Sequence, residues 1–213
     1  IKDRIILSGN FDASILGLGI DNVQFFANGV NTETTGVDLV LNWKKKMENS
    51  EISVDLSGNV NYMSITNINN KKLDKETFFG ERDRQFLLAS APKSKFSLGI
   101  NYEYKKLQTV LNFTRFSSVK LIDWQISEEI SNFNNSEAER LEAATDIYQP
   151  KITTDIHFSY QINTLINLQL GANNLLNIYP TKQHSYTDSG GLWDATQMGT
   201  NGSFYYTKFS LKL

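Results

Sequence analysis

The chain of 213 residues has no cysteine, only three prolines and only two histidines. Without cysteine it can form neither a disulfide framework nor a thiolate metal site, and the histidines, His157 and His184, lie far apart in sequence. It also lacks an uncharged apolar run of the roughly 18 residues that a membrane-spanning helix needs. The longest candidate, 13–20, contains a serine and two glycines. These absences exclude a helical membrane protein and leave metal and thiol chemistry little to work with, and no metal or other cofactor is expected.

Positively and negatively charged residues are nearly balanced. Lys and Arg number 21 and Asp and Glu number 23, which gives a formal net charge of -2. A nucleic-acid-binding domain normally carries a basic stripe and an alkaline isoelectric point, whereas the value here is about 5.8. Nucleic acid is therefore not an expected partner.

The dominant pattern is the alternation of apolar and polar residues with a period of two, which places successive side chains on opposite faces of a β-sheet. In the clearest segment, Phe96, Leu98 and Ile100 alternate with small or polar residues. No charged residue occupies the apolar side of any of these segments. The pattern predicts strands at 36–44, 52–62, 95–104, 107–114, 152–160, 166–173 and 205–213, after a partial strand at 1–7 with which the chain begins.

The connections between these strands alternate between very short and long. The short ones fall at 47–50, 105–106 and 161–165, and the long ones at 8–34, 67–92, 122–150 and 177–202. Short turns on one side and long loops on the other are typical of an outer-membrane β-barrel. A soluble β-sandwich, which also has one apolar face per sheet, remains the alternative.

Aromatic residues and strand length favour the barrel over the sandwich. Trp43, Tyr104 and Tyr160 lie on the apolar side next to the short turns, where a membrane interface would hold them. The strands run about ten residues or more, as strands that cross hydrocarbon at a tilt do. Eight strands could close a small barrel, but the first is incomplete and the loops are long. We therefore expect an open sheet whose edges are covered by a companion segment.

The C-terminal part closely resembles TonB-dependent outer-membrane receptors. An Asn-Leu-Leu-Asn-Ile-Tyr-Pro element at 174–180 matches the family's "NLFN-x-YP" element, and Gly-Thr-Asn-Gly-Ser-Phe-Tyr at 199–205 matches "G-x-NG-x-[FY]-[YF]". The family usually ends in an aromatic residue, whereas this chain ends in Leu213. Further segments that look like the family, in the same order, are 3–11, 34–39 and 79–82.

The resemblance implies an all-β, antiparallel transmembrane barrel of 22 strands, of which residues 1–213 form the C-terminal portion of about eight. It also implies that the plug domain and the N-terminal strands lie outside this chain. The implied activity is TonB-energised import of a scarce nutrient, an iron chelate, cobalamin or glycan, across the outer membrane of a Gram-negative bacterium. The implied partners are outer-membrane lipid, the rest of the barrel and its plug, TonB through the N-terminal part, and the small-molecule nutrient. No enzyme activity is expected, because the residues around His184 form no nucleophile elbow.

Ligand contacts are expected in the long external loops, because loops carry binding residues on a rigid scaffold. Aromatic rings there can stack on a ligand and arginines can pair with an anion. The alternative is that the same rings pack the loops together. The candidates are Phe25, Phe26, Phe78, Phe79, Arg82, Arg84, Trp124, Tyr186 and Trp193.

One loop contains the only clear helical stretch, 136–144. Ser136 and Glu139 have the spacing of a capping box, which predicts a short helix in an external loop. Two functional alternatives remain open, a passive porin or adhesion-type barrel and a soluble sandwich that binds a partner.

Overall fold

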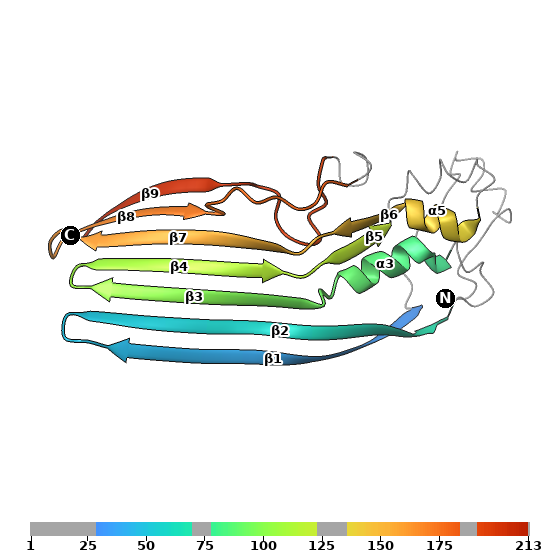
Figure 1. Cartoon of the computed structure of the whole chain (residues 1–213), viewed down its shortest axis with the longest axis horizontal. Coiled ribbons are helices and arrows are strands. Elements are labelled where there is room, and N and C mark those ends of the chain that lie inside the picture. Colours follow the sequence, from blue (N-terminus) through green and yellow to red (C-terminus); the bar gives the residue numbers. More distant parts are fainter. Residues whose placement is uncertain (1–28, 70–77, 123–135, 184–190, 213) are drawn as a thin grey trace, which may run out of the picture.

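The computed structural model describes residues 29–69, 78–122, 136–183 and 191–212. Seven strands form one antiparallel sheet in the order β1-β2-β3-β4-β7-β8-β9 (Figure 1). Each strand predicted within these residues is present. Their bounds are β1 (Val30–Lys46), β2 (Ser50–Ile68), β3 (Ser94–Tyr104), β4 (Leu107–Phe116), β7 (Lys151–Gln161), β8 (Ile166–Asn173) and β9 (Phe204–Leu211).

Apart from a register shift between Asn31 and Thr32 near the start of β1, the register brings the alternation of all seven strands into phase. Residues paired across neighbouring strands form rows, and a row of apolar residues on one face is followed by a row of mainly polar residues on the other. One row of the apolar face is Trp43, Val54, Ile100, Leu111, Ile156, Ala172 and Tyr205. The next row, on the polar face, is Lys44, Ser53, Asn101, Val110, His157, Gly171 and Tyr206.

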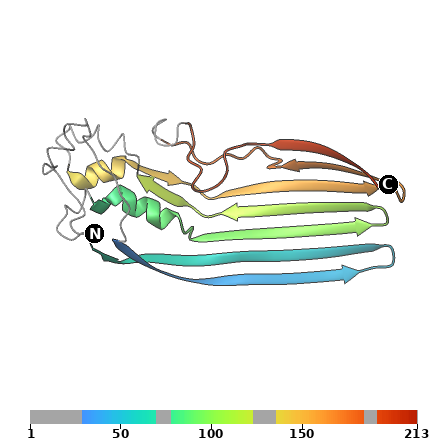
Figure 2. The same cartoon turned by 180° about the vertical axis from the view of Figure 1, so that it is seen from behind.

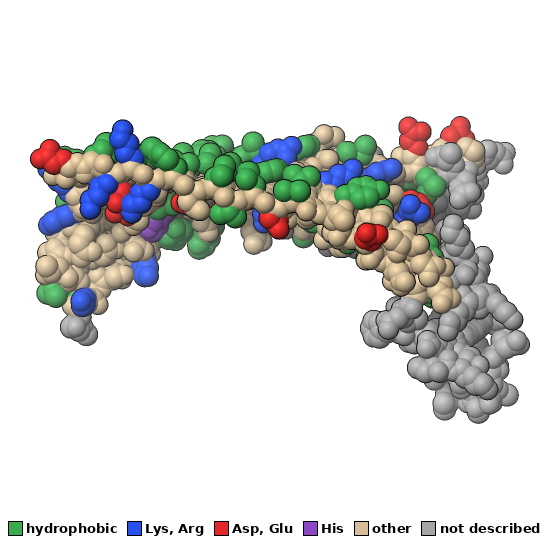
Figure 3. All heavy atoms as spheres, turned by 90° about the horizontal axis from the view of Figure 1, so that it is seen from below, with side chains coloured by type: hydrophobic (Ala, Val, Ile, Leu, Met, Phe, Trp, Pro, Cys, Tyr) green, Lys and Arg blue, Asp and Glu red, His purple; other side chains and the backbone are tan. Residues whose placement is uncertain are grey.

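The apolar face is exposed over the length of the sheet. Leu41 and Phe209 are 55% and 62% exposed, and Trp43 is 53% exposed. Hydrophobic side chains gather along the upper side of the sheet in Figure 3. In the part of the chain that the structure describes, no second sheet stacks on this face. The open antiparallel sheet of a partial β-barrel is therefore confirmed, and the described residues do not form the two stacked sheets of a β-sandwich.

The two ends of the sheet differ. The turns β1–β2, β3–β4 and β7–β8 lie together at one end, on the left in Figure 1 and on the right when seen from behind in Figure 2. Neighbouring turns are joined by hydrogen bonds, since Lys105 N donates to Asn49 O and Gln161 N donates to Lys106 O. The long connections lie at the other end. We call these the turn end and the loop end.

The loop end contains regular structure that the sequence did not indicate. Besides helix α5 (Glu137–Ala143), which confirms the helix expected at 136–144, it holds helix α3 (Glu81–Ala89) and a hairpin of β5 (Val119–Ile122) and β6 (Thr145–Tyr148). The expectation that 136–144 is the only helix in the loops was wrong. The sequence pattern does not reveal α3, because its apolar residues are confined to its second half, 86–89, and form no full helical stripe. A small core holds these elements together: Ala89, Val119, Leu121 and Tyr148, with Phe86 packed against it.

Two strands run further than expected and add charged residues to the apolar face. Lys45 lies near the turn end of β1, and Arg115 lies near the loop end of β4 between Phe96 and Ile152. Arg115 Nη1 donates a hydrogen bond of 3.4 Å to Ser94 Oγ. Long cationic side chains can keep their charge in water from such positions while their stems lie on apolar surface. Charge is therefore absent from the middle of the apolar face but not from its borders.

Candidate functional site: the polar face of the sheet

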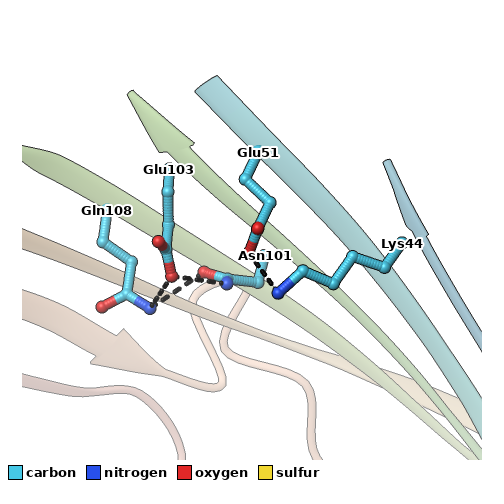
Figure 4. A network of polar contacts seen from close by, with 5 residues as sticks. All are labelled: Lys44, Glu51, Asn101, Glu103 and Gln108. Carbon is cyan, nitrogen blue, oxygen red and sulfur yellow. Dashed lines mark hydrogen bonds and ion pairs between the residues drawn. The ribbon is translucent and has the colours of Figure 1, made fainter. Parts of the chain in front are cut away.

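Near the turn end, the polar face carries charged side chains that are paired with one another (Figure 4). Lys44 Nζ lies 2.5 Å from Glu51 Oε1 across the β1–β2 pair. Glu103 Oε1 accepts hydrogen bonds from Asn101 Nδ2 at 3.1 Å and from Gln108 Nε2 at 3.2 Å. These contacts connect strands β1 to β2 and β3 to β4. The five residues of Figure 4 thus pair with one another within the sheet, whereas Lys46 and Lys208, at the two ends of the same row, have no ion-pair partner among the described residues.

In the middle of the polar face, an aromatic ring lies across a glycine. The Tyr206 ring covers Gly171, so that a Cβ at this glycine would overlap the ring. The Tyr206 hydroxyl lies 3.2 Å from His157 Nδ1, and the two rings stack with centroids 6.1 Å apart. His157 thus has a polar partner and an aromatic neighbour on the sheet itself.

At the loop end, the polar face carries lysines that are not paired with carboxylates. Phe116 of β4 lies in register between Lys95 of β3 and Lys151 of β7. Lys95 Nζ lies 5.1 Å from the centre of the Phe116 ring. Lys93 precedes Lys95 by two residues, and its backbone oxygen accepts a hydrogen bond from Asn61 N. Among the described residues, none of these three lysines has an ion-pair partner within 4.0 Å.

A row of hydroxyl groups lies one step closer to the turn end than the lysines. Ser97 Oγ and Thr114 Oγ1 are 3.5 Å apart on β3 and β4. The register extends this row to neighbouring strands on both sides. Its four hydroxyl residues are Ser57, Ser97, Thr114 and Thr153. The loop end of the polar face thus combines ammonium groups with neutral hydroxyl donors.

Gln197 fixes the long β8–β9 connection to the sheet. Its side chain is 6% exposed, and Nε2 lies 2.8 Å from both Ser117 O and Gln149 O and 3.4 Å from Tyr148 O. These carbonyls lie where the chain leaves β4 and where it enters β7. A single buried amide therefore holds three segments together at the loop end.

The candidate ligand residues fall partly outside the described residues. Phe25, Phe26, Trp124 and Tyr186 lie there, so nothing is placed for them. Phe78 and Phe79 come directly before α3, and the Phe78 ring lies against Gly29.

The remaining candidates are at two separate places in the chain. Arg82 lies on α3 with its guanidinium 4.6 Å from the centre of the Phe86 ring, and Arg84 Nε is 4.0 Å from Glu81 Oε2. Trp193 lies in the β8–β9 connection and stacks on Tyr179 at 4.5 Å. These described side chains make contacts within the loops, and whether they also bind a ligand stays a prediction.

The two C-terminal elements that carry the family resemblance pack against each other. Asn177 Oδ1 accepts a hydrogen bond of 3.0 Å from Ser203 N. Gly202 has a φ of 64°, and the Tyr179 hydroxyl lies where its Cβ would be. Only glycine fits a site with both features. The first element therefore positions the chain as it enters the last strand, β9.

Sequence reasoning did not single out Gln197, Lys95 or Lys151 as functional. The alternation placed Lys95 on the polar face, but its proximity to Lys151 depends on β4 pairing with β7, which are separated by the β5–β6 excursion. Alternation within each strand does not predict which strands pair, so it could not bring Lys95 and Lys151 together.

Within the described residues, no helix is long and apolar enough to cross a membrane, and no group of three or more metal-binding side chains gathers. A family model described as "TonB dependent receptor-like, beta-barrel" matches residues 1–175. A search of curated proteins finds no match to the chain. The family match covers β1 to β8 and agrees with the resemblance found in the C-terminal elements.

Proposed function

Because the chain belongs to the TonB-dependent receptor-like β-barrel family, an outer-membrane family of transport receptors, we propose that it forms one sector of a receptor wall that imports a scarce nutrient with energy delivered through TonB. The observation that supports this most directly is the single sheet with one exposed apolar face and one polar face. The apolar face suits contact with hydrocarbon, in which every backbone group must be paired internally. The polar face suits an interior that contains water or protein.

In this proposal the sheet is completed by further strands to a barrel of 22, and a plug domain lies against the polar face. The loop end is external and the turn end periplasmic, as is usual for such barrels. The nutrient would meet the loops first. Among the candidates in those loops are Phe78, Phe79, Arg82, Arg84 and Trp193, with Phe25, Phe26, Trp124 and Tyr186 in the parts that are not described.

The test is uptake by cells that contain or lack the complete receptor, each with and without TonB. The probes are radiolabelled ferric citrate, a ferric catecholate chelate, cyanocobalamin and a neutral maltooligosaccharide. We expect one of them to accumulate only when both receptor and TonB are present. Uptake that needs the receptor but proceeds equally without TonB would instead identify a passive porin. Surface attachment without any uptake would identify an adhesion-type barrel.

A further inference from the structure

The lysines of the polar face are clustered at one end of the sheet. At the turn end, Lys44 is paired with Glu51, and the remaining strand lysines, Lys46 of β1 and Lys208 of β9, lie at opposite edges of the sheet. At the loop end, Lys95 and Lys151 flank Phe116, Lys93 lies two residues from Lys95, and none of the three has an ion-pair partner among the described residues. A cluster of charges of one sign raises the local concentration of oppositely charged ligands.

We propose that the loop end of the polar face is a binding site for an anionic, oxygen-rich ligand, centred on the Lys95–Phe116–Lys151 row. This inference rests on the proposed function, because it assigns a chemical class to the nutrient that the receptor imports. It favours a ligand bearing carboxylate, phosphate or catecholate oxygens over a neutral glycan.

The register defines the spacing of the site. Lys95 and Lys151 flank Phe116 on the two strands next to β4. Neighbouring strands lie about 4.8 Å apart, so the two lysine backbones are roughly 10 Å apart. Both ammonium groups can therefore reach opposite sides of one multivalent anion above the Phe116 ring. The ring contact holds Lys95 over the centre of the row, away from the outer strands.

Neutral donors line the side of the site toward the turn end. Ser97 and Thr114 lie two residues further along their strands on the same face, about 7 Å from the lysine row. Hydroxyl groups can donate hydrogen bonds to ligand oxygens without adding charge. Lys93 lies two residues beyond Lys95 on the opposite side, so the site is bordered by hydroxyls on one side and a third cation on the other.

The nearest carboxylate in the lysine row is Asp38. It lies two strands from Lys95, with Asn59 between them, and Asn59 Oδ1 accepts a hydrogen bond from Lys95 N. Asp38 makes no ion pair with Lys95 within 4.0 Å. The row itself thus carries two lysines against one aspartate, and the next carboxylates on this face, Asp55 and Asp155, lie two rows closer to the turn end.

The test measures binding to the complete receptor in detergent by isothermal titration calorimetry. The probes are ferric citrate and a ferric tris-catecholate, which are anionic, and cyanocobalamin and maltohexaose. The variant is K95Q/K151Q. The matched control is K208Q/K212Q, which removes the same charge near the turn end. Heat-modifiable mobility on gels confirms that both variants fold.

We expect an anionic probe to bind, with an affinity that decreases as salt is added. Each lysine should contribute about tenfold, so K95Q/K151Q should weaken binding by about a hundredfold while the control stays within about twofold. The inference is overturned if no anionic probe binds, if the neutral saccharide binds more tightly, or if K95Q/K151Q keeps its affinity for the anion. TonB-dependent uptake of a neutral probe would overturn this inference alone. Uptake that does not depend on TonB would overturn the import proposal instead.

Discussion

At the scale of single residues, glycines in this sheet leave space for large side chains of the neighbouring strand. A Cβ at Gly58 would overlap the Phe96 ring on the apolar face, and one at Gly171 would overlap the Tyr206 ring on the polar face. An aromatic ring that covers a strand glycine replaces the packing that the glycine lacks. Sequence alternation identifies these glycines as strand residues but does not show which ring covers them.

Gly171→Ala should destabilise the folded receptor by about 1–3 kcal/mol, because the new methyl group displaces the Tyr206 ring and disturbs its contact with His157. Chemical denaturation in detergent, followed by tryptophan fluorescence, measures the change. Gly191→Ala is the matched control, since a Cβ there meets nothing within 4 Å. Equal stability of the two variants would show that the packing of the Tyr206 ring does not require a glycine at position 171.

At the scale of elements, the strands were predictable and the loop structure was only partly so. Alternation identified the strands because one side of each is apolar over most of its length. Helix α5 was predictable because its capping box is local, and the structure shows Ser136 N donating to Glu139 Oε2 at 2.8 Å. Helix α3 and the β5–β6 hairpin depend on a small shared core, which is formed by residues distant in sequence.

The same limit applies to the candidate site. The lysines and hydroxyls were visible as polar-face residues of separate strands. Their proximity depends on strand pairing between β4 and β7, so local sequence could not combine them.

Each strand should tolerate a new cation on one face and not on the other. Leu111→Arg, in the middle of β4 on the apolar face, should reduce stability by about 2–4 kcal/mol and lower the amount of assembled receptor. Asn112→Arg is the matched control on the polar face, where Asp55 and Asp155 lie in the same row. The measurement is the heat-modifiable fraction in outer membranes. Similar losses in both variants would contradict the assigned orientation of the sheet.

The stability of the first turn of helix α5 should depend on pH. Hydrogen bonds from the side chain and backbone of Ser136 hold the pKa of Glu139 below its ordinary value. A carboxyl with a lowered folded-state pKa stabilises the helix above its unfolded-state pKa, and this contribution is lost as pH falls through the folded-state pKa. Cα chemical shifts of 137–143 should therefore move toward coil in acid.

Glu139→Gln is the control for this pH effect. Glutamine can still accept the capping hydrogen bonds, but it does not titrate. The variant should keep its helical shifts across the same pH range. Equal acid sensitivity in both proteins would assign the transition to another group.

At the scale of the whole molecule, the sheet has two edges, along β1 and β9. Each edge presents backbone groups that no described strand pairs, and lipid offers them no hydrogen-bond partner. The apolar and polar faces remain continuous up to both edges, because the register keeps all seven strands in phase. Further strands that pair at β1 and β9 would extend both faces without a break, and this is the geometry that a closed wall requires.

Hydrogen exchange can test that both edges are paired in the complete receptor. The amides of β1 that point away from β2, about half of the strand, should exchange slowly there and rapidly in the isolated 213-residue chain in detergent. The reason is that an unpaired edge amide is open to solvent, whereas one in a closed wall is hydrogen-bonded. The amides of β4, which has β3 on one side and β7 on the other, serve as the internal control and should be slow in both samples. Fast exchange of the outward β1 amides in the complete receptor would mean that this edge stays open, and a continuous barrel wall could not then pass through β1.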